Sequence, residues 1–187
     1  RSVASAFQSI KSKDSKIIIA GGQENMSLAP HAVELREGRK LGDAKIIDTM
    51  IKDGLWDAFN GYHMGVTAEN VATKFQVTRE QQDKFALASQ EKALRAQKEN
   101  KFKNEIIDFK IKSKKSETIF NEDEHIREGT SLDTLSRLKP VFQKNGTVTA
   151  GNASGINDGA AAVVLMEEKE AEKKKLNKLV KIKSWAS

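Results

Sequence analysis

The sequence contains no cysteine and only two prolines among its 187 residues. Without cysteine, these residues offer no disulfide framework, no Cys-ligated zinc or iron–sulfur site and no thiol nucleophile. No apolar run approaches the roughly 20 residues of a membrane-spanning helix, and the longest runs, Ile17–Ala20 and Ala160–Met166, are typical of buried strands. We therefore expect a soluble protein with no membrane partner.

Aromatic residues are also scarce, at 6% with a single Tyr and two Trp. Single-stranded nucleic acids bind to proteins through stacking aromatics beside clustered Lys and Arg. The net charge of +6, from 32 basic and 26 acidic residues, is mild and spread among both signs. The sequence therefore predicts no nucleic-acid partner, although a basic surface still attracts small polyphosphorylated ligands.

Apolar periodicity indicates an α/β fold. Val3, Ala6, Phe7 and Ile10 recur at the spacing of an amphipathic helix. Ile17–Ala20, closed by two glycines, predicts a buried parallel strand. The small residues of Ala160–Met166 predict a second buried strand that passes very close to its neighbour, and Glu167–Lys175 predicts a charged surface helix.

Helix signals follow in the middle of the chain. Asp43 is positioned to cap a helix over Ile46–Ile51 that ends at Gly54. A second helix is predicted over Ala68–Phe75, beginning at Gly65 or Thr67. Thr78 and Gln81 form a capping box that opens a long helix to about Gln97.

That long helix is predicted to pack through Phe85, Ser89, Ala93 and Ala96, with Asp83 on its solvated side. Beyond it, two segments alternate weakly and predict edge strands, Glu105–Ile111 and Glu117–Phe120, joined by the basic turn Lys112–Lys115. Leu179–Trp185 also alternates and predicts a strand.

Few side chains stand out as candidates for chemistry. His31 and His125 lie among charged residues, which is typical of surface histidines. His63 lies between Gly61 and Gly65, where the backbone can approach a ligand, although an ordinary packed histidine remains the alternative.

The segment Gly151–Gly159 has two interpretations, a structural turn into a strand or a cradle in which backbone N–H groups and the Ser154 hydroxyl hold a ligand. Its glycine spacing is not that of a dinucleotide or phosphate loop. The carboxylates Glu122, Asp123, Glu124 and Asp158 lack metal-ligand spacing, so we expect no metal.

Five segments together resemble the thiolase family, in particular its biosynthetic acetyl-CoA acetyltransferase (acetoacetyl-CoA thiolase) type. They are Gly21–His31, Asp48–Leu55, Gly61–Gly65, Ala68–Ala72 and Thr149–Ala161. The resemblance runs through the whole chain in one continuous order. It implies an internal fragment of a longer protein with a thiolase-like α/β fold.

The resemblance also implies a division of the chain. Residues 1–25 would end the N-terminal half of the thiolase core, and residues 26–156 would form an inserted loop domain that binds substrate, with a tetramerisation loop at about 27–51. Residues 157–177 would form the return strand and helix of the N-terminal half. Residues 178–187 would form the first strand of the C-terminal half.

The activity implied is a reversible Claisen condensation of two acetyl-CoA molecules to acetoacetyl-CoA and CoA through an acyl-cysteine. One cysteine acts as nucleophile and another as base, while a histidine and an asparagine form oxyanion holes. None of these groups is expected within this sequence, so an isolated fragment is predicted to be inactive. A degradative 3-ketoacyl-CoA thiolase and a non-catalytic acyl-CoA-binding protein are the alternatives.

By match to the family's motifs, eight residues are expected to contact coenzyme A or the acyl group. A buried Ser154 hydroxyl and His63 would lie along the pantetheine arm, and Met64 would narrow the acyl pocket. Arg127 would lie against the adenine of coenzyme A. Four residues would line the tunnel that leads to the acyl pocket: Leu55, Phe142, Ala150 and Ile156.

The resemblance further implies that no separate cofactor is used, because coenzyme A thioesters are the substrates. It implies a homotetramer and a cytoplasmic location, with mitochondria as the alternative.

Overall fold

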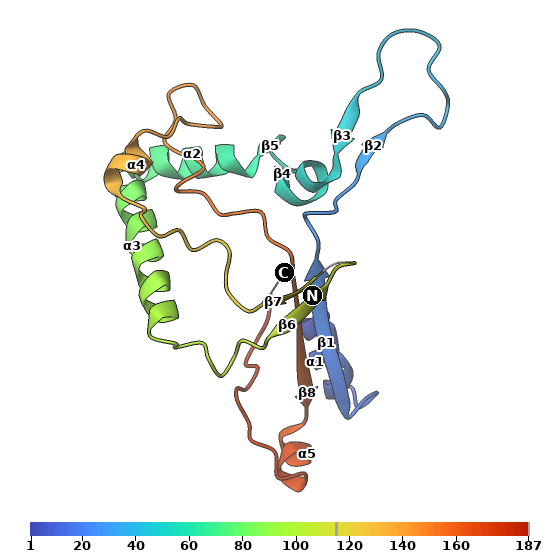
Figure 1. Ribbon diagram of the computed structural model, residues 1–187. Helices are drawn as coiled ribbons and strands as arrows, with labels where there is room; N and C mark the ends of the chain where they lie inside the picture. The colour runs from blue at the N-terminus through green and yellow to red at the C-terminus, as the bar shows by residue number, and fades with distance from the viewer. Residues whose placement is uncertain (115, 187) are drawn as a thin grey trace. The chain divides into compact units, whose positions relative to one another are not determined.

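The computed structural model describes residues 1–114 and 116–186. The chain divides into two compact units, Arg1–Pro30 with Ile156–Ser187, and His31–Gly155. Each unit has its own helices and strands (Figure 1). None of the described helices is long and apolar enough to cross a membrane.

The first unit is built on a pair of long strands, β1 (Ile17–Glu24) and β8 (Gly159–Met166). They run antiparallel, with Ile17 opposite Met166 and Glu24 opposite Gly159. The predicted parallel strand is therefore wrong among the described residues, since β1 pairs directly with β8 and continues through both glycines. The predicted close approach is confirmed, because a Cβ on Gly21 would lie 2.7 Å from the Ala161 carbonyl oxygen.

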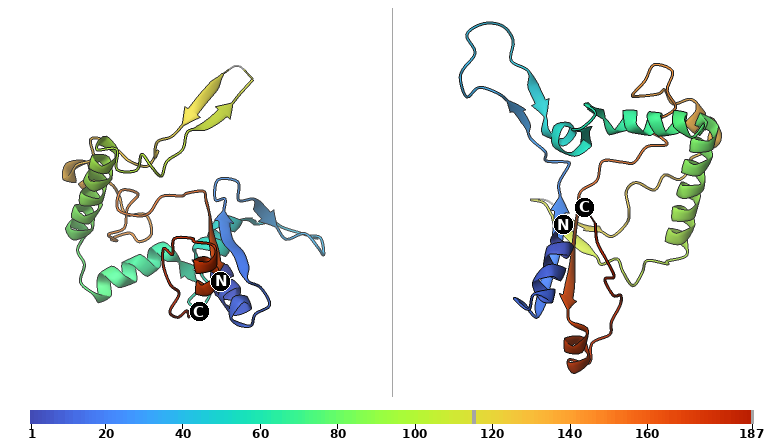
Figure 2. Two further views of the ribbon diagram at one scale, coloured as in Figure 1. Left: turned by 90° about the horizontal axis from the view of Figure 1, so that it is seen from below. Right: turned by 180° about the vertical axis from the view of Figure 1, so that it is seen from behind.

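Helix α1 (Ser2–Lys11) confirms the amphipathic prediction, and it lies along the β1–β8 pair in the views of Figure 2. Ala6 and Ile10 of this helix are buried, as is Ala20 of β1. Most other side chains of both strands are exposed, so their predicted burial is wrong within this chain. The short helix α5 (Glu168–Lys173) follows β8 as predicted.

The predicted strand Leu179–Trp185 does not form in the described residues. A strand requires a hydrogen-bonded neighbour, and no described strand pairs with this segment. Trp185 instead lies under the Arg1 guanidinium, 5.4 Å from ring centroid to carbon.

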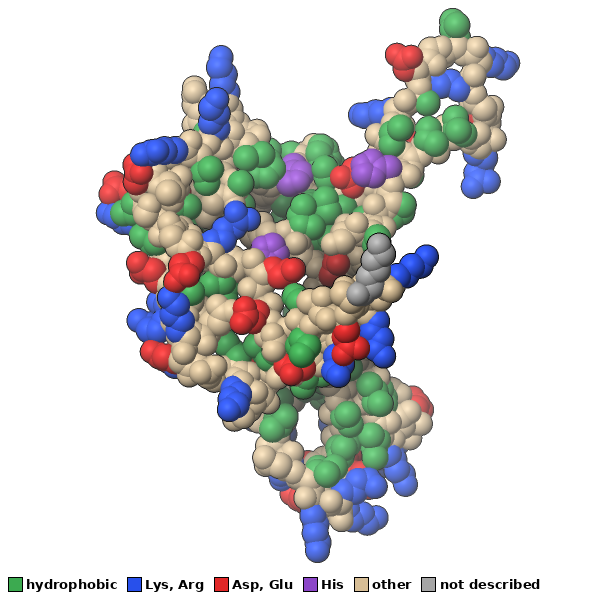
Figure 3. All heavy atoms as spheres, viewed as in Figure 1, with side chains coloured by type: hydrophobic (Ala, Val, Ile, Leu, Met, Phe, Trp, Pro, Cys, Tyr) green, Lys and Arg blue, Asp and Glu red, His purple; other side chains and the backbone are tan. Residues whose placement is uncertain are grey.

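The second unit begins with a long hairpin, β2 (His31–Val33) paired with β3 (Ile46–Asp48). The predicted helix over Ile46–Ile51 is thus wrong at its start, because Ile46 and Ile47 pair with β2. A π-helical segment, Met50–Leu55, follows, and the Asp48 carboxylate accepts the Met50 N–H at 2.9 Å. The hairpin loop carries mixed charged and apolar side chains on its surface (Figure 3).

Two helices form the body of this unit, α2 (Met64–Lys74) and α3 (Arg79–Lys98). The predicted capping box is confirmed, since Thr78 Oγ1 accepts the Gln81 N–H at 3.2 Å and Gln81 Oε1 accepts the Thr78 N–H at 2.8 Å. The pair β4 (Trp56–Asp57) and β5 (Tyr62–His63) precedes α2, and helix α4 (Leu132–Ser136) packs against α3.

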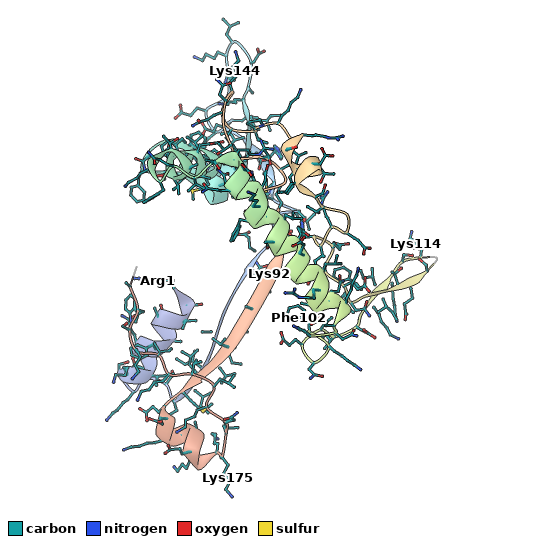
Figure 4. The ribbon with its side chains drawn as sticks, turned by 90° about the vertical axis from the view of Figure 1, so that its left-hand side faces the viewer. Arg1, Lys92, Phe102, Lys114, Lys144 and Lys175 are labelled. Atoms are coloured by element: carbon teal, nitrogen blue, oxygen red, sulfur yellow. The ribbon has the colours of Figure 1, made fainter. Side chains whose placement is uncertain are left out.

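The hairpin β6 (Phe109–Lys112) and β7 (Glu117–Phe120) confirms the predicted pair of edge strands, although its first strand begins later than predicted. Figure 4 shows Lys114 near the end of this hairpin and Lys92 on α3. The predicted turn residue Lys115 lies outside the described residues.

The predicted packing face of α3 is wrong at Phe85 and Ser89, which are exposed, while Ala93 and Ala96 are half-buried. Phe85 is 78% exposed, whereas Asp83, assigned to the solvated side, is only 4% exposed. Asp83 is buried because its carboxylate is bonded on both sides, to Arg79 on its own helix and to the Asn152 side chain.

Candidate ligand-binding site

His63 forms the N-cap of α2. Its Nδ1 accepts the Gly65 N–H at 2.9 Å, and its ring stacks on Phe142 with centroids 4.7 Å apart and planes 23° from parallel. Nδ1 is an acceptor, so this geometry assigns the neutral imidazole with its proton on Nε2. The site therefore presents a neutral N–H donor beside an aromatic face.

The glycines around His63 have local structural reasons. A Cβ on Gly65 would lie 2.3 Å from Phe142 Cδ2, so only glycine lets the Phe142 ring cover the start of α2. Gly61 has a φ of +76°, a left-handed conformation that favours glycine in the turn before β5. The sequence predicts that the glycines allow a ligand to approach the backbone. At Gly65 the missing side chain instead makes room for the ring of Phe142, itself a predicted site residue.

Leu55 and Met64 lie on either side of His63 in the sequence. Leu55 is half-buried and directly precedes Trp56, which pairs with His63 in the β4–β5 ladder. Met64 opens α2 and is 47% exposed. The structure therefore gathers His63 and Phe142 in direct contact, with Leu55 and Met64 on the elements next to them.

The loop after Phe142 is held by its own polar groups. Thr149 is completely buried and its hydroxyl accepts the Gly151 N–H at 3.2 Å. The Asn152 side chain accepts the Thr149 N–H at 2.8 Å and donates to the Thr147 carbonyl at 3.0 Å. These bonds close the loop around Ala150, whose side chain is exposed.

Ser154 follows this closed loop, and it is exposed. The prediction of a buried Ser154 hydroxyl is therefore wrong, because the loop buries Thr149 in its interior. An exposed hydroxyl remains available to a ligand.

Glu69 on α2 holds the start of the same loop. Its carboxylate, 3% exposed, accepts the N–H groups of Thr147 and Val148 at 2.8 Å each and the Thr147 hydroxyl at 2.9 Å. Burial raises the pKa of Glu69, but the bonds from Val148 and Thr147 lower it further, so the net pKa is below its ordinary 4.5. The carboxylate is thus ionised at neutral pH.

Asp83 on α3 holds the other end of the loop. One oxygen accepts the Asn152 amide at 3.0 Å, and the other accepts Arg79 Nε at 2.8 Å. Arg79 also donates to the carbonyls of Leu135 and Leu138, at 2.7 and 3.0 Å. One ion pair therefore connects α3, α4 and the loop.

The two remaining predicted residues are Arg127 and Ile156. Arg127 is exposed, and its backbone N–H donates a hydrogen bond to Gln90 Oε1 at 2.9 Å. Ile156 begins the returning segment of the other unit and is 56% exposed. Among the described residues, no contact of Arg127 with His63 or Phe142 is found.

No cluster of three or more His, Asp or Glu suited to a metal occurs in residues 1–114 and 116–186. A hollow of about 430 Å³ lies in the other unit, lined by residues of α1 and of the segment 182–186. No predicted site residue lines that hollow.

Sequence reasoning missed Glu69, Asp83 and Asn152. A signal for Glu69 was present, because Gly65, Glu69 and Ala72 recur at i, i+4 and i+7 and form the buried face of α2. Asp83 stands four residues after Arg79, the spacing of a helical ion pair. Nothing local marks Asn152, because its partners lie up to 69 residues away.

Comparison with known proteins gives consistent matches. Residues 1–169 match the family described as "Thiolase, N-terminal domain". The chain is 58% identical over 187 residues to an acetyl-CoA acetyltransferase of Rhizobium meliloti, covering 100% of this chain and 48% of the relative. It is 51% identical over 188 residues to a cytosolic acetyl-CoA acetyltransferase of Rattus norvegicus, covering 100% and 47%.

Among solved structures, human mitochondrial 3-ketoacyl-CoA thiolase superposes with a TM-score of 0.85 at 40% identity, covering 94% of this chain and 45% of that one. The chain therefore spans about half the length of the relatives it matches.

Proposed function

The chain belongs to the thiolase family and has its α/β fold, and from that premise we propose that it forms the coenzyme A-binding part of an acetyl-CoA C-acetyltransferase. The reaction would be the reversible condensation of two acetyl-CoA molecules to acetoacetyl-CoA and CoA. This sequence has no cysteine, so the nucleophile and the second catalytic cysteine would come from residues outside it. Coenzyme A thioesters would be substrates, with no separate cofactor.

The observation that carries the proposal is the identity of 58% over the whole chain to a relative named acetyl-CoA acetyltransferase. The site chemistry supports it. A neutral His63 N–H and an exposed Ser154 hydroxyl are hydrogen-bonding groups that suit the uncharged amides of a pantetheine arm. The apolar side chains of Met64, Leu55 and Phe142 suit a short acyl group, and Phe142 stacks on His63.

The remaining residues have roles at the margins of that site. Ala150 and Ile156 would line the acyl tunnel, and Arg127 would lie against the adenine. We keep the division into a core end (1–25), a loop domain (26–156) and a return segment (157–177) as part of the proposal.

A degradative 3-ketoacyl-CoA thiolase is the second candidate, because a 3-ketoacyl-CoA thiolase has the same fold. Both candidates share the fold, so chain-length preference separates them. An acetyl-CoA acetyltransferase should cleave acetoacetyl-CoA well and longer 3-ketoacyl-CoA thioesters poorly. A protein that binds CoA without cleaving any of them would be a non-catalytic relative.

The test uses the full-length protein, assayed for CoA-dependent cleavage of acetoacetyl-CoA. The 187-residue chain alone should show no thioester cleavage above buffer, because it supplies no thiol. Ser154→Ala and His63→Ala should each raise the KM for coenzyme A by roughly tenfold, the loss of one hydrogen bond of about 1.4 kcal/mol. Unchanged KM values in both variants would refute their assigned roles.

Assembly and location belong to the same proposal. The β2–β3 hairpin falls in the segment 27–51 expected to join subunits, so shortening its loop should convert a homotetramer to dimers in sedimentation experiments. We propose a cytoplasmic location, supported by the relative named cytosolic. Mitochondria are the alternative, and imaging of the tagged full-length protein decides between them.

A further inference from the structure

We propose that Glu69 and Asp83 are positioning residues, which fix the Thr147–Ser154 segment and thereby set the affinity for coenzyme A thioesters. The inference about affinity rests on the proposed function. The inference about the segment rests on the geometry alone.

The Glu69 carboxylate acts as an anchor for backbone. Its two oxygens accept hydrogen bonds from the N–H groups of Thr147 and Val148 and from the Thr147 hydroxyl. In the described part of the chain no ion pair of Glu69 is found, so its charge is compensated by these donors. A Cβ on Gly146 would lie 2.3 Å from Glu69 Oε1, which shows how closely the backbone wraps the carboxylate.

Asp83 acts through Asn152. The Asn152 side chain bonds Asp83, the Thr147 carbonyl and the Thr149 N–H at once, with distances of 3.0, 3.0 and 2.8 Å. These three hydrogen bonds fix the orientation of the Asn152 amide. Asp83 is itself held by its ion pair with Arg79. Directional bonds from α2 and α3 thus set the segment at residues 147, 148 and 152, and Asn152 in turn holds Thr149.

The predicted ligand contacts lie directly on this framework. Ala150 follows the buried Thr149, and Ser154 stands two residues after Asn152. Among the described residues, no hydrogen bond that would orient either of them is found. Their positions are therefore inherited from the bonds of Glu69 and Asp83.

The test compares Glu69→Gln and Asp83→Asn in the full-length protein. Both substitutions keep the side-chain size and replace one acceptor oxygen by an amide, so the fold is retained while the bonds loosen. We expect the KM for coenzyme A to rise about tenfold, with kcat within about twofold, because the reacting groups are untouched. Glu80→Gln is the matched control, since Glu80 lies on the same helix as Asp83, pairs with Lys84 at the surface, and should leave both constants unchanged.

Amide hydrogen exchange gives a readout that does not depend on activity. Exchange of Thr147–Ser154 should accelerate in both variants and remain native in Glu80→Gln. If the unsubstituted protein lacks acetyltransferase activity, the proposed function fails, while exchange still tests the anchoring. Unchanged exchange, or a lowered melting temperature with KM and kcat both native, would overturn the inference.

A second variant leaves both carboxylates in place. Gly146→Ala should displace the Glu69 carboxylate by steric contact and raise KM in the same direction as Glu69→Gln. A native KM and native exchange in Gly146→Ala would count against the anchoring role.

Discussion

In the unit formed by Arg1–Pro30 and Ile156–Ser187, the buried side chains among the described residues are Ala6, Ile10, Ala20 and Ala171. In the unit His31–Gly155, Glu69, Asp83 and Thr149 are buried beside Ala72, Leu135 and Val148. One unit thus buries apolar groups and the other also buries charge.

The difference follows from what each unit has to hold. Apolar packing is non-directional and tolerates small shifts, whereas a buried carboxylate is stable only with its hydrogen bonds in place. Strands β1 and β8 already fix one another through their ladder. Within residues 1–114 and 116–186 the segment Thr147–Asn152 has no strand partner, and side-chain bonds from α2 and α3 supply the constraint instead.

The largest expected effect is at the ion pair of the second unit. Asp83→Ala leaves the Arg79 guanidinium and the Asn152 amide without their shared acceptor. We expect a loss of about 3 kcal/mol in the free energy of unfolding, as for other broken, largely buried pairs. Urea denaturation measures the loss. A change under about 1 kcal/mol would show that the buried charge of the second unit does not stabilise it as proposed.

A substitution in the apolar unit should cost somewhat less and act differently. Ile10→Ala removes a side chain that is 7% exposed at the contact between α1 and the strand pair. We expect a loss of about 2.5 kcal/mol from transfer and cavity terms. The loss should be independent of pH and leave the KM for coenzyme A native, and a raised KM would contradict the separation of roles.

Gly65→Ala tests the packing of the predicted site. Its new Cβ would meet the Phe142 ring at 2.3 Å, so the ring has to move away from His63. We expect about 1.5 kcal/mol of destabilisation from overpacking. The stack between His63 and Phe142 should also be lost in a crystal structure of the variant, and an intact stack would show that α2 shifts instead.

The smallest effect is a dependence on pH. The pKa of Glu69 is lowered in the folded protein, so its stabilisation is present above about 4.5 and is lost as the pH falls through the folded pKa. Glu69→Gln should remove about 1 kcal/mol at pH 7 and flatten the acid limb. Denaturation of the unsubstituted protein and of Glu69→Gln from pH 7 to pH 3 gives the free energy of unfolding at each pH. Parallel curves would exclude Glu69 as the source of the loss of stability in acid.

Most of the helices and most of the strands predicted from local patterns do form. The periodicity of Val3–Ile10 and the Thr78–Gln81 box are properties of adjacent residues, and both helices form as expected. Ile46 and Ile47 carry the same local signal as a helix, but β2 offers them backbone partners and they form a strand. Pairing with a distant segment overrides a weak local preference.

In the candidate site, too, a local motif predicted one residue, and contacts between distant residues decided the rest. The motif Gly61–Gly65 drew attention to His63, and the structure adds that Phe142 stacks on it. The sequence predicts a buried Ser154, but Ser154 is exposed, two residues after Asn152, whose side chain bonds Asp83 69 positions away. The roles of these side chains in binding stay predictions.

The sequence by itself determined the family, most of the helices and the absence of a thiol, because motifs, periodicity and composition are properties that residues carry in any conformation. Only the tertiary structure decided that Asp83 is buried, that β1 runs antiparallel to β8, and that Glu69 holds the loop at Thr147 and Val148. Each of these depends on residues more than 60 positions apart meeting in space, as the 78 positions between Glu69 and Thr147 illustrate.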